Sequence, residues 1–478
     1  MDDGEPMVSD TGPHATPDRR RASARPRPPS VERVLTAVRP TAGDRDAVAV
    51  RAIVRVVVDE ERGRLAAGLA PRSIDGLAVA VRERLAALEG LEGGERSAVV
   101  NATGVIVHTN LGRATWPAAA IEAARAAASG SLFLELDAAT GRRGRRYRQA
   151  EDHLVALTGA DDALVTNNNA AAVALAVGLA GRKGVAVARG ELVEIGGGVR
   201  IPEIVRRAGA RLVEVGTTNR TRVTDFEGPL ADGRVAIVLR VHPSNFVQSG
   251  FVEAPDPAAL AELAHRHGAI VVDDLGSGAL LDTAAFGLAH EPTPAERLAL
   301  GADLVCFSGD KLVGGPQAGL LVGRADLVAR IRRDPLARAM RPDKVTLVGV
   351  AATLALYRAG VATRSIPVWR AIATPVDVLR DRARRLAATT GPGLDVEAVE
   401  TASTVGGGSL PGETQPSWGV ALRTPSADRL LARLRAGDPP IVGRIEHDRV
   451  ILDLRTVDPG DDERLAAAIR AAIGPSSR

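Results

Sequence analysis

From about residue 97 onward, short apolar runs rich in β-branched residues alternate with alanine-rich stretches of helical periodicity. The apolar runs span 163–166, 184–188, 211–216, 235–242, 269–274, 303–308 and 319–323, and the clearest helical stretches span 169–182 and 256–268. This alternation predicts an α/β domain, with a mostly parallel sheet and helices on both faces. Ligands of such domains bind at the carboxyl ends of the strands, so the polar residues that follow each run are candidate site residues.

Two regions with a different pattern of apolar and polar residues flank this domain. Helical periodicity at 30–38, 45–68 and 73–90 predicts a small N-terminal helical domain. Helices at 343–360 and 375–391 lead to a C-terminal α+β part. We therefore expect four parts: a disordered tail (1–27), the helical domain (28–95), the catalytic domain (96–370) and a small C-terminal α+β domain (371–478).

Composition restricts the class of protein. The 478 residues carry a net charge of +3, which neither demands nor excludes a nucleic-acid partner. Cys306 is the only cysteine, so an intrachain disulfide is impossible, a thiolate metal cluster is not expected, and its apolar context predicts a buried strand position. The sequence has neither an apolar run of membrane-spanning length nor the pattern of a signal peptide, so we expect a cytoplasmic protein without membrane contact.

Lysine is rare in this chain. It occurs only at Lys183, Lys311 and Lys344, while the other 58 basic residues are arginines. A GC-rich codon bias explains the depletion but does not explain which lysines remain. A nucleophilic amine that must lose its proton cannot be replaced by arginine. Lys183 and Lys344 lie at predicted helix boundaries, where surface positions are expected, whereas Lys311 follows a strand and enters a glycine-rich turn.

Several predicted strands end in polar residues that suit a phosphorylated ligand. Asn167, Asn168 and Asn169 stand between a strand and a helix start, where free N–H groups bind anions, although ordinary helix capping is the more common explanation of such residues. Asp273 and Asp274 end another strand, and either carboxylate can pair with a protonated ring nitrogen or cap the next segment. The remaining strand-end candidates are His242, Ser244, Asn245, Ser308, Asp310 and Lys311.

Together these residues match the needs of an enzyme that uses pyridoxal phosphate (PLP). A lysine holds the PLP aldehyde as a Schiff base, an aspartate keeps the pyridine nitrogen protonated, and a helix start with a serine binds the phosphate. No P-loop and no H-E-x-x-H motif compete with this interpretation. The glycines at 196–198 form no dinucleotide fingerprint, and those at 406–408 are expected in a loop.

Longer motifs support a specific family. They are "VVNATGVIVHTNLGRA", "ARGELVEIGGGVRIPEI", "EVGTTNRT", "HPSNFVQSGFVEAPD", "VVDDLGSG" and "FSGDKLVGGPQAG". With these motifs the chain resembles bacterial L-seryl-tRNA(Sec) selenium transferases, also called selenocysteine synthases, over roughly residues 28–475. The resemblance implies a fold-type I PLP enzyme that converts seryl-tRNA(Sec) to selenocysteinyl-tRNA(Sec) with selenophosphate, through an aminoacrylyl intermediate.

The resemblance also implies roles for individual residues. Lys311 is the PLP lysine, Asp310 lies beside it at the active centre, and Arg113, Arg338 and Arg341 bind selenophosphate or its phosphate. The forked guanidinium group suits that anion. For fold-type I enzymes in general, the carboxylate at the pyridine nitrogen would be Asp273, with Asp274 as second choice. Asn168, Asn169, Ser308 and Asn245 complete the expected cofactor site.

The family further implies a homodecamer with active sites between subunits, and a grip on the tRNA by the N-terminal domain. Aromatic residues make up only 2% of the chain, so we expect contacts to tRNA phosphates and shape rather than base stacking. Two other interpretations stay open. One is a PLP ammonia-lyase acting on an amino-sugar phosphate, and the other is a tRNA-binding protein without catalysis. The N-terminal domain argues against the first, and Lys311 against the second.

Overall fold

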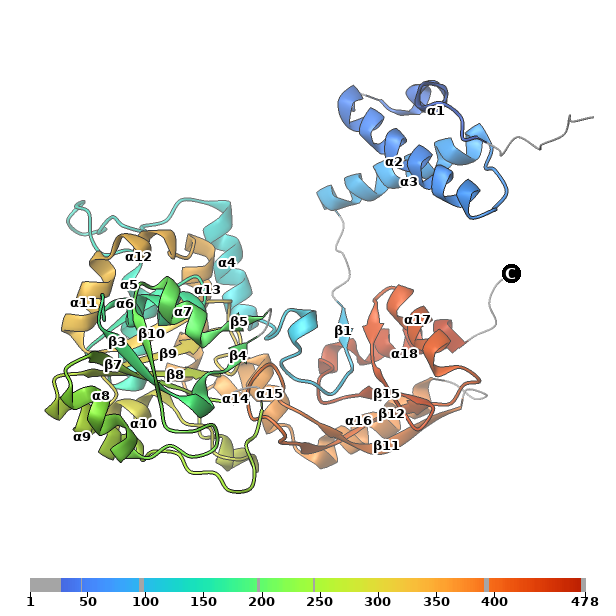
Figure 1. Cartoon of the computed structure of the whole chain (residues 1–478). Coiled ribbons are helices and arrows are strands. Elements are labelled where there is room, and N and C mark those ends of the chain that lie inside the picture. Colours follow the sequence, from blue (N-terminus) through green and yellow to red (C-terminus); the bar gives the residue numbers. More distant parts are fainter. Residues whose placement is uncertain are drawn as a thin grey trace, which may run out of the picture. The chain divides into compact units, whose positions relative to one another are not determined.

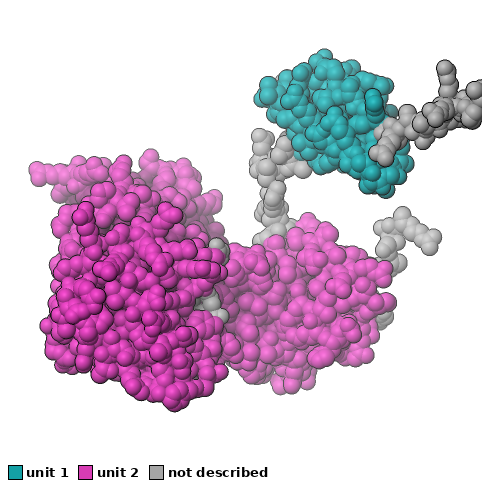
Figure 2. All heavy atoms as spheres, viewed as in Figure 1, with its two compact units in different colours: residues 1–96 teal, residues 97–478 magenta. Residues whose placement is uncertain are grey.

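A computed structural model describes residues 27–43, 45–93, 99–195, 198–243, 246–390 and 395–473 (Figure 1). The chain divides into two compact units, residues 1–96 and 97–478, which Figure 2 colours separately. The predicted disordered tail lies outside the described residues except for Arg27. Asn245, one of the predicted cofactor residues, also lies outside them, together with Ser244.

The described residues of the first unit form three α-helices, α1 (Val31–Val38), α2 (Ala47–Ala66) and α3 (Ile74–Gly93). Ser30 and Asp46 cap the first two helices by accepting hydrogen bonds from backbone N–H groups. Buried valines and leucines from all three helices form its core. The three helical stretches recognised in the sequence therefore correspond to these three helices.

The second unit is built around a seven-stranded sheet. Its strands, in spatial order, are β2 (Asp162–Thr166), β10 (Gly319–Gly323), β9 (Leu304–Ser308), β8 (Ile270–Gly276), β7 (Val235–Val241), β3 (Gly184–Ala188) and β6 (Arg211–Val215). Strand β10 runs antiparallel to both neighbours, and the pairs from β9 to β6 are all parallel. The predicted α/β fold with a mostly parallel sheet is confirmed.

Helices cover both faces of this sheet (Figure 1). On β9, Leu304 and Cys306 face a core shared with α6 (Asn169–Gly178), α7 (Ile201–Arg207) and α11 (Ala325–Arg333). Val305 and Phe307 face the opposite core, shared with α5 (Arg148–Thr158) and α13 (Lys344–Arg358). Cys306 is fully buried, as predicted. The other helices of this part are α4 (Ala118–Ser129), α8 (Glu227–Ala231), α9 (Pro257–Arg266), α10 (Pro294–Ala299), α12 (Pro335–Ala339), α14 (Ala362–Ser365) and α15 (Pro367–Ala373). A two-stranded pair, β4 (Glu194–Ile195) and β5 (Val199–Arg200), lies outside the main sheet.

The C-terminal part has its own antiparallel sheet, in the order β11 (Val396–Ser403), β12 (Gln415–Leu422), β15 (Arg449–Asp453) and β14 (Arg444–Glu446). Helices α16 (Val376–Thr389), α17 (Ala427–Ala436) and α18 (Asp462–Ile473) pack on it around a separate apolar core. Strand β13 (Ile441–Val442) pairs in parallel with β1 (Val100–Asn101), far earlier in the chain. The segment after β1 is therefore anchored to the C-terminal part.

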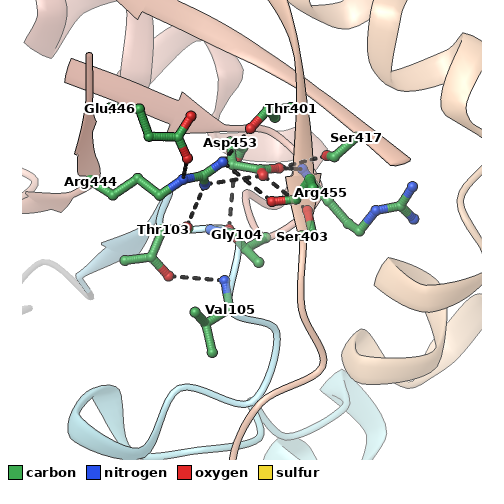
Figure 3. Close-up of polar contacts among 12 residues, drawn as sticks. Thr103, Gly104, Val105, Thr401, Ser403, Ser417, Arg444, Glu446, Asp453 and Arg455 are labelled. Atoms are coloured by element: carbon green, nitrogen blue, oxygen red, sulfur yellow. Dashed lines mark hydrogen bonds and ion pairs between the residues drawn. The ribbon is translucent and has the colours of Figure 1, made fainter. Parts of the chain in front are cut away.

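A buried carboxylate secures this anchor (Figure 3). Asp453 is fully buried and accepts hydrogen bonds from Ser403 (2.9 Å) and Ser417 (2.7 Å). Its Oδ2 lies 3.2 Å from the guanidinium of Arg444, which also donates to the carbonyl of Thr103 at 2.5 Å. Because every partner of the carboxylate comes from a different segment, this network fixes where residues 100–105 leave the C-terminal sheet.

Neither a membrane span nor a metal cluster is found in the part of the chain that the structure describes. No helix there is long and apolar enough to cross a bilayer. No group of three or more His, Cys, Asp or Glu side chains is arranged to hold a metal ion.

Candidate active site

Six of the predicted site residues line one cavity at the carboxyl ends of the strands. The cavity has a volume of about 470 Å³, and its wall includes Lys311, Asp274, Ser308, Asn168, Asn169 and Arg113. Strand β9 ends at Ser308, and the tight turn that follows returns the chain to β10. Apart from Arg113, these residues lie at the carboxyl ends of β2, β9 and β8, which are distant in sequence. In the sheet β9 and β8 are neighbours, and β10 lies between β2 and β9.

The side chain of Lys311 is largely removed from solvent and lies among charged groups. Burial lowers the pKa of Lys311 below its ordinary value, while the nearby carboxylate of Asp274 acts in the opposite direction. A lysine with a depressed pKa gives up its proton more readily near neutral pH, which nucleophilic and base chemistry both require. In this respect Lys311 differs from a typical surface lysine.

Asp274, and not Asp273, faces this cavity. Consecutive strand residues point to opposite faces of a sheet, so the two carboxylates separate. Asp274 accepts hydrogen bonds from the side-chain amide of Asn169 (2.8 Å) and the N–H of Gly276 (3.1 Å). Asp273 lies on the other face, 3.6 Å from Nε of Arg297. Asp273, our first choice for the pyridine partner, therefore does not line the Lys311 cavity, whereas Asp274, the second choice, does.

Burial raises the pKa of Asp274 to about 6, and the hydrogen bond from Asn169 and the charge of Lys311 partly oppose this effect. The negative charge of the buried Asp274 carboxylate is only partly stabilised by these neighbours. A further cation close to the carboxylate would therefore stabilise it. A protonated pyridine nitrogen is such a cation.

The start of α6 supplies an anion site. Asn168 caps the helix, because its Oδ1 accepts a hydrogen bond from the N–H of Ala171 at 2.9 Å. Oδ1 of Asn169 is buried and has no hydrogen-bond partner among the described residues. Gly319 of β10 passes so close to this turn that an added Cβ would lie 2.1 Å from the carbonyl oxygen of Asn168. Asn167 is turned away, and its N–H donates to the carbonyl of Met340 at 2.9 Å.

Arg113 and Asp310 form an ion pair at the edge of the cavity. Their side chains are 2.7 Å apart, and the N–H of Ala114 donates to the carbonyl of Asp310 at 3.1 Å. Arg113 has a φ of 66°, in the left-handed region that non-glycine residues rarely occupy. Such backbone strain persists only where surrounding contacts hold the residue in place. Here the ion pair with Asp310 is such a contact.

The single chain does not bring Arg338 and Arg341 to Lys311. Both side chains are exposed, and neither lines the cavity as the described residues define it. Arg341 instead lies 3.6 Å from Glu135, at the rim of a separate arginine-rich pocket. The predicted set of three anion-binding arginines is thus divided, with only Arg113 at the Lys311 cavity.

The cavity also contains residues that the sequence analysis did not select. Thr109, Gln317, Gly407 and Gly408 all contribute to its wall. The two glycines belong to the predicted loop at 406–408. Because this loop lies about a hundred residues beyond Lys311 in the sequence, its place in the cavity wall could not be predicted. Gln317 stands within a recognised motif, and its exposure in an otherwise buried turn is a feature that only the structure reveals.

The residues present fit PLP. They provide an amine for the aldehyde, a carboxylate for the pyridine nitrogen and the start of α6, where backbone N–H groups at a helix N-terminus suit a phosphate. The volume lies within the range of pockets for small ligands.

Comparisons with known proteins agree with this chemistry. A family model described as L-seryl-tRNA selenium transferase matches residues 99–458. The L-seryl-tRNA(Sec) selenium transferase of Hyphomonas neptunium is 46% identical over 380 residues, which are 78% of this chain and 82% of that protein. The enzyme of the same name from Nitratidesulfovibrio vulgaris is 42% identical over 461 residues, 93% of this chain and 98% of that protein.

A solved structure of D-glucosaminate-6-phosphate ammonia-lyase shares the fold. Its TM-score is 0.56 at 21% identity, and the match covers 80% of this chain and 97% of that one. At this identity the likeness concerns the fold alone.

Proposed function

This chain belongs to the L-seryl-tRNA selenium transferase family, and from that premise we propose that Lys311, Asp274 and the start of α6 are the PLP site of a selenocysteine synthase. The enzyme is a PLP-dependent transferase of selenocysteine biosynthesis that converts L-seryl-tRNA(Sec) to L-selenocysteinyl-tRNA(Sec). The observation that carries the site assignment is the shared cavity of Lys311 and Asp274. The ammonia-lyase alternative has only a likeness of fold in its support, and the family membership disfavours a binding protein without catalysis.

When bound, PLP supplies an electron-withdrawing ring that stabilises the negative charge left on the seryl α-carbon. Lys311 would hold its aldehyde carbon, Asp274 its ring nitrogen, and Asn168, Asn169 and Ser308 its phosphate. The low pKa of Lys311 then lets the freed amine take the proton from the seryl Cα. The proton now on Lys311 would go to the β-hydroxyl, which leaves Cβ as water. Selenium of the donor would then bond to Cβ, and hydrolysis of its P–Se bond would release phosphate.

Arg113 would bind the anionic selenium donor, which we propose to be selenophosphate. The ion pair with Asp310 fixes the guanidinium at the cavity edge, and the remaining N–H groups stay available for phosphate oxygens. Arg338 and Arg341 are proposed to reach the donor from a second copy of the chain, because the exposed side chains of one copy point away from their own Lys311 cavity. This arrangement requires a homo-oligomer, which the family resemblance puts at a decamer.

Residues 28–95 are proposed to bind the tRNA as a separate domain, followed by catalytic and C-terminal α+β domains that meet near residue 370. The relative from Nitratidesulfovibrio vulgaris matches over 93% of the chain, so its match extends into the N-terminal unit. We place the enzyme in the cytoplasm, where aminoacyl-tRNAs are made and used.

A lysine comparison tests the site. Lys311→Arg keeps the positive charge but cannot bind PLP covalently, so the purified variant should lack the visible PLP band and all turnover of seryl-tRNA(Sec). Lys183→Arg, the same substitution at an exposed lysine, should retain both. Turnover by the Lys311→Arg protein would refute the assignment. For the unsubstituted protein, the PLP band should shift with seryl-tRNA(Sec) and not with free serine.

A further inference from the structure

A second cavity adjoins the Lys311 cavity, and Val241 and His242 line both. Its volume is about 450 Å³, and ten ionisable residues contribute to its wall. Six of them surround the part next to His242: Glu191, Arg240, His242 itself, Asp273, Glu291 and Arg297. They form three ion pairs, Arg240–Glu191 at 3.7 Å, Arg297–Asp273 at 3.6 Å and His242–Glu291 at 3.8 Å. All three separations exceed hydrogen-bond length, so none of these side chains is held tightly by its charged partner.

His242 and Glu291 differ from the two arginine pairs because His242 also borders Lys311. Glu291 is 2% exposed, and its backbone N–H donates to the hydroxyl of Thr283 at 2.8 Å. The Oε1 atom of Glu291 and the Nδ1 atom of His242 are both buried, without a hydrogen-bond partner among the described residues. A small side-chain rotation would join them, and both groups would then be satisfied.

The main chain positions this pair. The backbone N–H of His242 donates to the carbonyl of Asp274 at 2.8 Å, so the histidine lies directly beside the residue at the base of the Lys311 cavity. With Nδ1 directed at Glu291, the other ring nitrogen, Nε2, is left for the shared wall. A carboxylate that accepts a hydrogen bond from Nδ1–H keeps the proton on Nδ1. The lone pair is then on Nε2, which is the arrangement of a general base.

We propose that His242, oriented by Glu291, accepts the proton of the seryl α-ammonium group as seryl-tRNA enters the Lys311 cavity. The proposal rests on the proposed function, because it assumes an aminoacyl ester as substrate. One N–H bond of the ammonium breaks, its proton moves to Nε2, and the electron pair stays on nitrogen, which becomes the nucleophile. Glu291 stabilises the imidazolium that forms. Lys311 keeps its separate task at the Cα proton.

The charges around His242 suit a base. Burial lowers the pKa of His242, Glu291 and Asp273 raise it, and Arg297 and Arg240 lower it, with the net result below the ordinary value. Asp274 and Lys311 face it from the other cavity. The ring is therefore neutral at pH 7 and free to take a proton. An α-amino group has a pKa of about 8, so most of the substrate arrives protonated and needs an acceptor.

The pH dependence of substrate capture distinguishes this role from a structural one. The PLP-loaded enzyme is mixed rapidly with seryl-tRNA(Sec), and the rate of change of the visible PLP absorbance is recorded from pH 6.5 to pH 9. We expect His242→Gln to lower this rate about tenfold at pH 7, because only about one substrate amine in ten is already deprotonated there and can react without the base. The defect should shrink to about threefold or less at pH 9, where the substrate amine is already deprotonated. Glu291→Gln should show the same trend with a smaller defect.

His290→Gln is the matched control, because His290 lines only the second cavity and its side chain is about half exposed. It should match the unsubstituted enzyme at every pH. Equal rates for His242→Gln and the unsubstituted enzyme would overturn the proposal, and so would a defect of constant size across the pH range. If the unsubstituted holoenzyme gave no absorbance change with seryl-tRNA, the proposed function itself would fail, and this proposal with it.

Discussion

Gly104 is the position where one added methyl group should most disturb the connection between the two parts of the catalytic unit. It has a φ of 80° and lies against the buried Asp453–Arg444 pair (Figure 3). An added Cβ would lie 2.5 Å from Nη1 of Arg444 and 2.5 Å from Oδ2 of Asp453. Both atoms are fixed by further hydrogen bonds, so neither moves away without breaking the pair.

The expected cost has two parts. An alanine in the left-handed region costs about 1 kcal/mol net, because the backbone strain exceeds the entropy gained through the stiffer unfolded chain. Separating a buried, hydrogen-bonded ion pair adds about 3 kcal/mol. Gly104→Ala should therefore destabilise the unit by about 4 kcal/mol, a large share of the usual stability of about 5–15 kcal/mol for a domain.

Gly209→Ala isolates the first part. Gly209 has a similar φ of 86°, belongs to the same unit, and an added Cβ there would meet no atom within 4 Å. Urea unfolding followed by far-UV circular dichroism should show a loss of about 1 kcal/mol for Gly209→Ala and about 4 kcal/mol for Gly104→Ala. Equal losses for the two variants would show that the Asp453 network does not restrict Gly104, and the reasoning would fail.

Two further predictions concern the site and the substrate. Asp274→Asn should abolish turnover and weaken PLP binding, whereas Asp273→Asn should retain the PLP band; the reverse pattern would restore our original assignment. In the PLP-free protein, burial raises the pKa of Asp274 to about 6, from about 4 in the unfolded chain, so stability is lost as the pH rises through this window. Asp274→Asn should remove that loss, a relative gain of about 3 kcal/mol at pH 7 measured by urea unfolding. Deleting residues 1–95 should strongly weaken tRNA(Sec) binding and flatten its dependence on salt concentration, measured by filter binding; unchanged affinity would contradict the assignment of the tRNA contact to the N-terminal domain.

Much of the fold was predictable because the chain repeats one simple pattern. The seven apolar runs correspond to the seven strands of the main sheet, since buried parallel strands read as continuous β-branched segments. Strand β11 was missed, because Val396–Ser403 is only partly buried and its alternating glutamates resemble a loop. The pairing of β1 with β13 was also missed, because a two-residue strand leaves no periodic signal and its partner lies more than 300 residues away.

The sequence allowed residues at the strand ends to be selected as site residues, but it did not show which other segments complete the wall of the cavity. Lys311, Ser308 and the asparagines at the start of α6 could be selected because each follows an apolar run directly. The wall contributed by Gly407 and Gly408 could not, because their segment reaches the cavity only through tertiary contacts. An added Cβ at Gly407 would lie 2.7 Å from the carbonyl oxygen of Val107, so the glycine allows that close approach.

The sequence could not show which of the two adjacent aspartates, Asp273 or Asp274, faces the Lys311 cavity. Both follow the same apolar run, and a shift of one residue in the strand exchanges their faces, so periodicity cannot order them. The register of β8 against β7 fixes the answer by pairing Asp273 with Arg240 and Asp274 with Val241. The first pair places two charges on the face of the second cavity, and the second leaves Asp274 beside the Lys311 amine. One carboxylate thus joins the ion pairs near His242, and the other is left for the cofactor.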